Sequence, residues 1–177
     1  MKNRAETLLK GLPMSVFFAK TLEDMASRED LVRRSGMEFL QGIFDGTLSA
    51  APMAETLNFQ MTALADGEVS FEGTPLQSAT TPMRGVHGGW YGALLDSVMG
   101  CAVMTRIPKG RSYTTLEYKV NITRAVQGGQ KVRATGFIDH AGRSTATARG
   151  EVRGLDDGRL YASGTTTCLL MDGTPAG

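Results

Sequence analysis

The chain has 177 residues, enough for one domain with a substantial core, and its charges nearly cancel, with 19 Lys and Arg against 18 Asp and Glu. This balance argues against nucleic acid or an acidic membrane surface as the partner. Cys101 and Cys168 have no paired spacing and are expected to be free thiols. Neither a signal peptide nor an apolar run of membrane-helix length is recognisable, so we expect a cytoplasmic protein that does not bind a membrane.

Residues 1–50 are expected to form a helical extension ahead of a main domain, residues 51–177. The stretch AETLLKGLPMSVFF is typical of a short helix broken at residues 11–13. Further along, apolar side chains recur at spacings close to three and four among charged ones, which predicts one amphipathic helix that ends near Gly46. These apolar positions are Leu31, Met37, Phe39, Leu40, Ile43 and Phe44.

Beyond Pro52 the sequence is typical of strands around one long helix. Two strand-like runs flank Ala65-Asp66-Gly67-Glu68, which is a hairpin signal. The segment after Arg84 is too long for a typical strand and contains no proline, so we expect a helix. Three or four strands joined by short turns follow, which implies antiparallel pairing. Because a helix that is apolar nearly all round must be covered on most sides, we expect an α+β fold with an antiparallel sheet wrapped around this central helix.

Between Arg84 and Arg106 the only formally charged side chain is Asp96. An isolated carboxylate in an apolar interior is costly, so it must be solvated, paired or neutralised. Its structural interpretation is a buried salt bridge or a hydrogen bond to a strand. Its functional interpretation is a catalytic carboxylate.

The start of the predicted helix offers hydrogen-bond donors. The sequence His87-Gly88-Gly89 places the free N–H groups of the first turn at or near the two glycines. A helix N-terminus carries partial positive charge and suits an anion or a developing oxyanion. Asp96 follows eight residues after Gly88, and an oxyanion hole with a carboxylate suits attack on an activated carbonyl. Taken alone, the glycines also fit a turn, and His87 fits a structural histidine.

Other catalytic schemes match less well. The histidines and cysteines at 87, 101, 140 and 168 lack zinc spacing, so no metal site is expected. Ser97 adjoins Asp96, but no G-x-S-x-G sequence is present. The segment RGVHGG does not match a phosphate-binding loop.

The chain resembles the hotdog-fold acyl-CoA thioesterases of the phenylacetate-degradation type over roughly residues 52–171. The resemblance rests on GVHGGWYGALLDSVMGCAV, YTTLEYKVNITRA, GQKVRATGFIDHAGRSTATARGEV and DGRLYASGTTTCLL. Its specific part is HGG with an Asp eight residues past the first glycine. The resemblance implies a hotdog fold and an enzyme that hydrolyses an acyl-CoA. Coenzyme A is then part of the substrate, and no other cofactor is expected. It also implies a homodimer or dimer of dimers whose sites lie between two subunits.

The resemblance assigns roles to four residues of this chain. The backbone N–H of Gly88 polarises the thioester carbonyl, and Asp96 acts as nucleophile or as general base on water. His87 shapes the loop, and Thr114 helps to hold the attacking water. Gly88 and Asp96 of one site are expected to come from opposite subunits.

One position departs from the family pattern. Seven residues before Gly88 the family usually has Asn or Gln, whereas this chain has Thr81. A Thr hydroxyl is shorter and offers one donor rather than two. Either Thr80 or Gln77 substitutes for the amide, or turnover is reduced, or the substrate differs.

Substrate contacts are further expectations. Arg84 and Arg143 are candidates for binding the coenzyme A phosphates, and Gly89 for contact beside the carbonyl. The acyl pocket is expected around Trp90, Leu94 and Met99, for an aryl or a medium-chain acyl group. The main alternative function is a non-catalytic acyl-CoA-binding module. A dehydratase or hydratase is a third, and the sequence shows no Asp/His acid–base pair for it.

Overall fold

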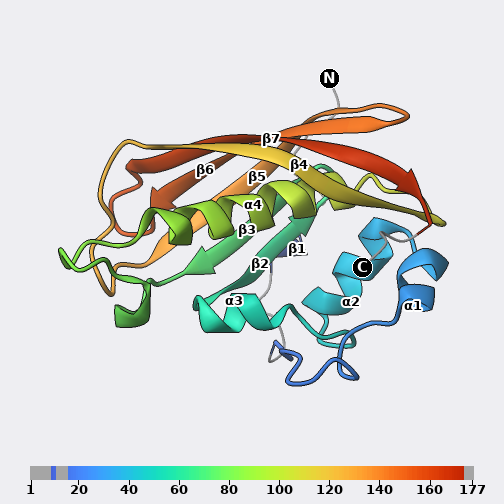
Figure 1. The fold of residues 1–177 in the computed structure, drawn as a ribbon, viewed down its shortest axis with the longest axis horizontal. Coiled ribbons are helices and arrows are strands. Elements are labelled where there is room, and N and C mark those ends of the chain that lie inside the picture. The colour runs from blue at the N-terminus through green and yellow to red at the C-terminus, as the bar shows by residue number, and fades with distance from the viewer. Residues whose placement is uncertain (1–8, 11–15, 174–177) are drawn as a thin grey trace.

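The computed structural model describes residues 9–10 and 16–173. In chain order the elements are β1 (Leu9–Lys10), α1 (Arg28–Arg33), α2 (Gly36–Phe44), α3 (Pro52–Thr56), β2 (Phe59–Ala65), β3 (Glu68–Gly73), the 3₁₀ helix η1 (Gln77–Ala79), α4 (Gly88–Met104), β4 (Arg111–Ile122), β5 (Val132–Ala141), β6 (Thr145–Gly154) and β7 (Leu160–Asp172). The strands form one antiparallel sheet in the order β1-β2-β3-β5-β6-β7-β4. Figure 1 shows this sheet curled around α4.

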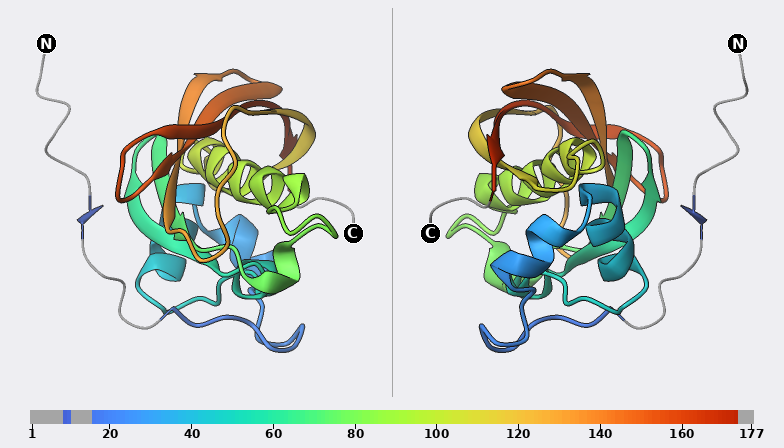
Figure 2. Two further views of the ribbon diagram at one scale, coloured as in Figure 1. Left: turned by 90° about the vertical axis from the view of Figure 1, so that its left-hand side faces the viewer. Right: turned by 90° about the vertical axis from the view of Figure 1, so that its right-hand side faces the viewer.

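Helix α4 is the centre of the core. Ten of its residues are buried, and it packs against every strand from β3 to β7. The end-on views of Figure 2 show the sheet around this helix. One strand comes very close at Gly136 on β5, where a Cβ atom would lie 2.2 Å from the carbonyl oxygen of Val98. Only glycine lets the strand come this near the helix backbone. The predicted α+β fold, with a sheet around a central helix, is confirmed.

The single amphipathic helix predicted before Gly46 is wrong in one respect, because the structure divides it into α1 and α2. Each of the two begins at its own capping box, with Ser27 and Asp30 at α1 and Ser35 and Glu38 at α2. In each box the serine hydroxyl accepts from the N–H three residues on, and the acid accepts from the serine N–H. Ser35 is extended and so interrupts the helix.

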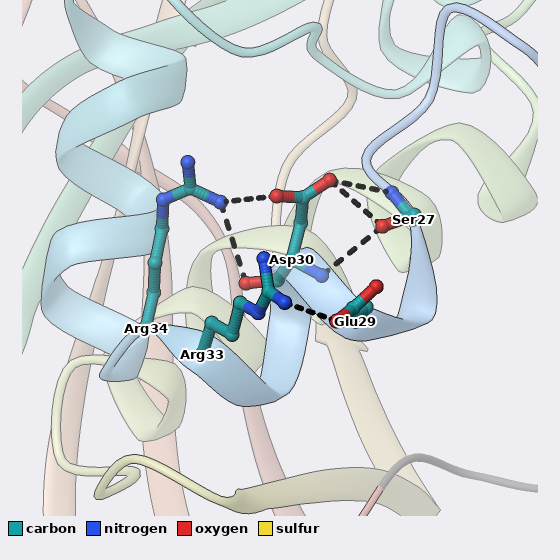
Figure 3. A network of polar contacts seen from close by, with 5 residues as sticks. All are labelled: Ser27, Glu29, Asp30, Arg33 and Arg34. Atoms are coloured by element: carbon teal, nitrogen blue, oxygen red, sulfur yellow. Dashed lines mark hydrogen bonds and ion pairs between the residues drawn. The ribbon is translucent and has the colours of Figure 1, made fainter.

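Side-chain ion pairs add to the first capping box. Arg34 donates to Asp30 and Arg33 to Glu29, four residues apart along the helix (Figure 3). Such exposed pairs contribute at most a few tenths of a kcal/mol each, so the capping box is the stronger signal for where α1 begins.

The short helix predicted before residue 19 is wrong at Leu9 and Lys10, which form β1 and pair with Leu64 and Ala63 of β2. Residues 5–8 and 11–15 of that prediction lie outside the described residues. The predicted boundary at residues 50/51 falls just before α3 and stays a prediction. Among the described residues, no helix has the length and hydropathy needed to cross a bilayer.

Candidate active site

One face of α4 lies against β4 and carries almost no side chains. Residues at successive spacings of four share a helix face, and here they are Gly88, Gly92, Asp96 and Gly100. The β4 side chains that reach these positions are, in the same order, Ile122, Tyr118, Thr115 and Tyr113. The glycines make room for the β4 side chains. Asp96 is therefore the one polar side chain on this face of the helix.

Asp96 is half-buried and is held by one hydrogen bond. The hydroxyl of Thr115 donates to Asp96 Oδ1 at 3.1 Å. Burial raises the pKa of Asp96 above its ordinary value of 3.8, and the Thr115 hydrogen bond partly offsets this by favouring the charged form. The charged form of this carboxylate is therefore less stable than that of an exposed aspartate, so the group is more basic. Raised basicity suits a group that accepts a proton or attacks a carbonyl.

Thr115 was missed by the sequence reasoning, which singled out its neighbour. Simple alternation along the strand places Thr115 with Glu117, on the face opposite Tyr118. The pairing of β4 with β7 shifts register between Thr115 and Glu117, so Leu116 forms a bulge and Thr115 faces α4 together with Tyr118.

Thr114 is exposed, and strand alternation places it on the other face from Thr115. The described side-chain hydrogen bonds of Asp96 do not include Thr114. The predicted role of Thr114 in holding water stays a prediction, but Thr115 is the hydroxyl that contacts the carboxylate within one chain.

His87 is the N-cap residue of α4. Its Nδ1 accepts from the N–H of Gly89 at 2.9 Å, and its own N–H donates to the carbonyl of Ala79. The N–H of Gly89 is therefore already bonded, whereas no described residue accepts from the N–H of Gly88, which is exposed. From the sequence, the backbone N–H of either glycine could be the donor. In the structure only the N–H of Gly88 is available, because that of Gly89 is bonded to His87.

Gly88 and Asp96 of one chain are too far apart to act on one carbonyl. Eight residues at about 1.5 Å per residue separate them by about 12 Å along the helix axis. A thioester carbonyl held by Gly88 is therefore out of reach of the Asp96 carboxylate of the same chain. The expectation that the two groups come from different subunits stays a prediction.

Thr81 lies in the loop that leads into α4. Its N–H donates to the carbonyl of Gly85, and the N–H of Arg84 donates back to the carbonyl of Thr81, which closes a tight turn. Arg84 has a φ of 64° in this turn and is exposed. The Thr81 side chain is half-buried and makes no hydrogen bond to any described residue. Thr81 and Arg84 thus belong to the Gly88 end of α4.

The second candidate for binding phosphate, Arg143, lies far from that loop. It is exposed in the turn between β5 and β6, beside Ser144, whose carbonyl accepts from Leu170. Leu170 pairs with Tyr113, which reaches the Gly100 end of α4. Within one chain, Arg84 and Arg143 therefore lie near opposite ends of α4.

A cavity of about 270 Å³ opens beside Asp96. Its polar groups come from Asp96, Ser97, Gln60, Cys101 and Tyr113, and the rest of its wall is mostly apolar. Burial raises the pKa of Cys101 to about 12 and that of Tyr113 well above its ordinary value. Asp96 is the one carboxylate among the described residues that line the cavity.

Trp90, Leu94 and Met99, which are predicted to surround the acyl group, do not line this cavity. Trp90, Leu94 and Met99 are at most 2 % exposed and belong to the core between α4 and the sheet. Trp90 also donates its indole N–H to the carbonyl of Leu57. None of the three is among the described residues that line the cavity. Sequence alone marks them as apolar but cannot tell core from cavity wall.

The Thioesterase superfamily matches residues 84–161, from the loop before α4 into β7. A conserved protein of Pseudomonas aeruginosa is 30% identical, with a TM-score of 0.64 over 69% of this chain and 95% of that chain. A mutant of the phenylacetic acid degradation protein PaaI from Thermus thermophilus is 30% identical, with a TM-score of 0.61 over 67% and 97%. A phenylacetic acid degradation-related protein of Ralstonia eutropha JMP134 is 27% identical, with a TM-score of 0.65 over 77% and 99%. No curated protein matches this sequence.

These matches cover nearly the whole of each relative and include the helix that carries Asp96. The chain belongs to the thioesterase superfamily and is a hotdog-fold member of the phenylacetate-degradation type.

Proposed function

We propose that the protein hydrolyses the thioester of an aryl- or medium-chain acyl-CoA to the free acid and coenzyme A. The observation that carries the proposal is the placement of Asp96, a half-buried carboxylate with a raised pKa at the polar part of a largely apolar cavity. Family membership supports thioester hydrolysis as the reaction class.

The chemistry needs two groups of this chain. The N–H of Gly88 donates to the thioester carbonyl oxygen and stabilises the negative charge that develops there during attack. Asp96 acts on the carbonyl carbon in one of two ways. As general base it takes a proton from the water that attacks. As nucleophile it forms a mixed anhydride that water then cleaves. In both cases the C–S bond breaks, the acid is released, and the thiolate of coenzyme A takes up a proton.

A second copy of the chain completes the site in this proposal. Within the described residues β4 pairs with β7 alone, so its other edge presents unpaired backbone groups. Leu116, Tyr118 and Ile122 on this strand are 57%, 46% and 48% exposed. Apolar side chains on an open edge favour pairing with another copy, which would cover the strand beside Gly88 and Asp96. A cytoplasmic homodimer, or a dimer of dimers, is the assembly we propose.

The test is thiol release from a panel of aryl, short-chain and medium-chain acyl-CoAs, followed with a disulfide-exchange dye. Asp96→Asn is expected to lose about 10²–10⁴-fold in kcat, the range typical of a general base. Asp156→Asn, at an exposed turn between β6 and β7, is the matched control and keeps the full rate. Equal rates for Asp96→Asn and wild type contradict the proposed role of Asp96.

A non-catalytic acyl-CoA-binding module remains the second candidate, because Thr81 stands where the family has an amide. No thiol release from any substrate, together with acyl-CoA binding in a calorimeter, favours that candidate over the enzyme.

A further inference from the structure

The cavity beside Asp96 is closed by a part of the chain that precedes the matched family region. The family match begins at residue 84, yet helices α2 and α3 supply Leu40, Ile43, Phe44 and Met53 to the cavity wall. The cavity is therefore built partly by segments outside the family match.

Helix α2 is packed firmly against the rest of the molecule. The N–H of Gly36, its first residue, donates to the carbonyl of Ile107 at 2.8 Å. A Cβ atom on Gly36 would lie 1.9 Å from the carbonyl oxygen of Met104, at the last residue of α4. Leu40 and Phe44 are buried in the main core cluster. The first residue of α2 thus packs directly against the C-terminal end of α4.

Helix α3 is anchored as well. The segment before it pairs with residues 17–19, because Ala50 donates to the carbonyl of Phe17 and accepts from the N–H of Ala19. Glu55 on α3 accepts two hydrogen bonds from Lys20, at 2.5 and 2.6 Å. Both helices are therefore tied to the rest of the molecule on two sides.

The cavity has the size and polarity of an acyl-group site. An engineered apolar cavity of about 150 Å³ in another protein holds benzene. The present cavity, at about 270 Å³, is less than twice that size, which suits an aryl-acetyl or a medium-chain acyl group. The Ser97 hydroxyl already donates to the carbonyl of Ala93. A thioester carbonyl placed beside Asp96 would leave its acyl chain directed along the apolar wall.

We propose that α2 and α3 form the end wall of the acyl site and that Ile43 limits the length of the acyl group. The proposal rests on the proposed function, because it takes the acyl group of a thioester as the occupant of the cavity. Ile43 lines the cavity and is only partly buried. Leu40 and Phe44 are buried core residues, so truncating them destabilises the fold as well.

The experiment compares Ile43→Ala with Met37→Ala in the full-length protein. Both residues lie on α2, both are partly buried against the core, and both substitutions remove the same number of non-hydrogen atoms. Only Ile43 lines the cavity beside Asp96. The probes are S-alkyl-CoA thioethers from S-butyl to S-dodecyl, which cannot be hydrolysed, and the dissociation constant is measured by calorimetry.

For wild type, affinity is expected to rise with chain length and then to stop rising where the chain reaches the wall. In Ile43→Ala this limit moves by about two carbons, and the first thioether beyond the wild-type limit binds about 10-fold more tightly. Met37→Ala keeps the wild-type limit. Ile43→Phe, which fills the cavity instead, moves the limit to shorter chains and serves as the second variant should the alanine variant fail to fold.

Three results overturn the inference: no thioether binding to wild type, the same limit in wild type and in the folded Ile43 variants, or an equal shift in Met37→Ala. Thiol release is measured in parallel on the matching acyl-CoAs. If the chain-length limit moves in the Ile43 variants but no acyl-CoA is hydrolysed, the proposed function is contradicted and the role of Ile43 is supported. If acyl-CoA is hydrolysed but the chain-length limit does not move, the role of Ile43 is contradicted and the proposed function is supported.

Discussion

The hydroxyl of Thr115 donates to Asp96 Oδ1 at 3.1 Å and connects the only carboxylate of α4 to the edge strand β4. The bond exists because a bulge at Leu116 turns Thr115 toward the helix. It favours the charged form of Asp96 against the cost of burial. The position of this one hydroxyl therefore affects the pH range in which the carboxylate is charged.

Thr115→Val is expected to move the acid limb of the kcat/KM profile to higher pH. Removal of the hydroxyl takes away the interaction that lowers the pKa of Asp96 and leaves burial, which raises it. The matched change Thr114→Val, one residue away and exposed, leaves the limb where it is in wild type. The profile is measured by thiol release over the acid and neutral pH range. If the acid limb moves in Thr114→Val and not in Thr115→Val, then Thr114, the residue favoured by the family resemblance, is the one that acts on Asp96.

Asp96→Asn is expected to unfold at a higher temperature than wild type at alkaline pH. Because burial raises the folded-state pKa of Asp96 above its unfolded value, wild type is stabilised below the unfolded pKa and loses that stability as pH rises through the folded pKa. Asparagine has no such loss. The difference in Tm, measured by calorimetry, shrinks as pH falls toward the ordinary value of 3.8. A Tm difference that grows on acidification contradicts a raised pKa.

Gly100→Ala is expected to destabilise the fold by about 1–3 kcal/mol through crowding of Tyr113. A Cβ atom at Gly100 would lie 2.6 Å from the Tyr113 hydroxyl oxygen but 3.4 Å from Cζ, which is near ordinary contact. Tyr113→Phe in the same chain removes the clashing oxygen and is expected to restore most of the loss. The free energy of unfolding in urea is compared for both single variants and the double variant. Additive losses would show that Tyr113 is not the obstacle.

Thr81→Asn is expected to raise kcat about 2–10-fold, which corresponds to one additional hydrogen bond of about 0.5–1.5 kcal/mol. The Thr81 side chain is half-buried, bonds to no described side chain, and stands where the family has an amide. Thr80→Asn is the neighbouring control, because the Thr80 hydroxyl already donates to the carbonyl of Gln77. Steady-state thiol release measures both. A gain in Thr80→Asn alone places the missing amide at residue 80.

The sequence predicted the sheet around α4 because the signals for it are local. An apolar segment without proline that is too long for a strand has to be a covered helix, and short turns between later strands force antiparallel pairs. The break between α1 and α2 was also present as the pattern Ser35-x-x-Glu38, although the apolar spacing across it suggested one continuous helix.

The sequence by itself determined the central helix, its glycine-rich start and the single carboxylate on it, since periodicity and one isolated charge need no knowledge of distant contacts. Only the tertiary structure decided that Thr115 rather than Thr114 contacts Asp96. The bulge in β4, which depends on the pairing with β7, changes which residues of the strand face α4. Only the tertiary structure separated core residues such as Leu94 from cavity residues such as Ile43, because both are apolar and differ only in what packs against them. Long-range packing of α2 against α4 and β2, and of α3 against β2, sets that difference, and no local pattern encodes it.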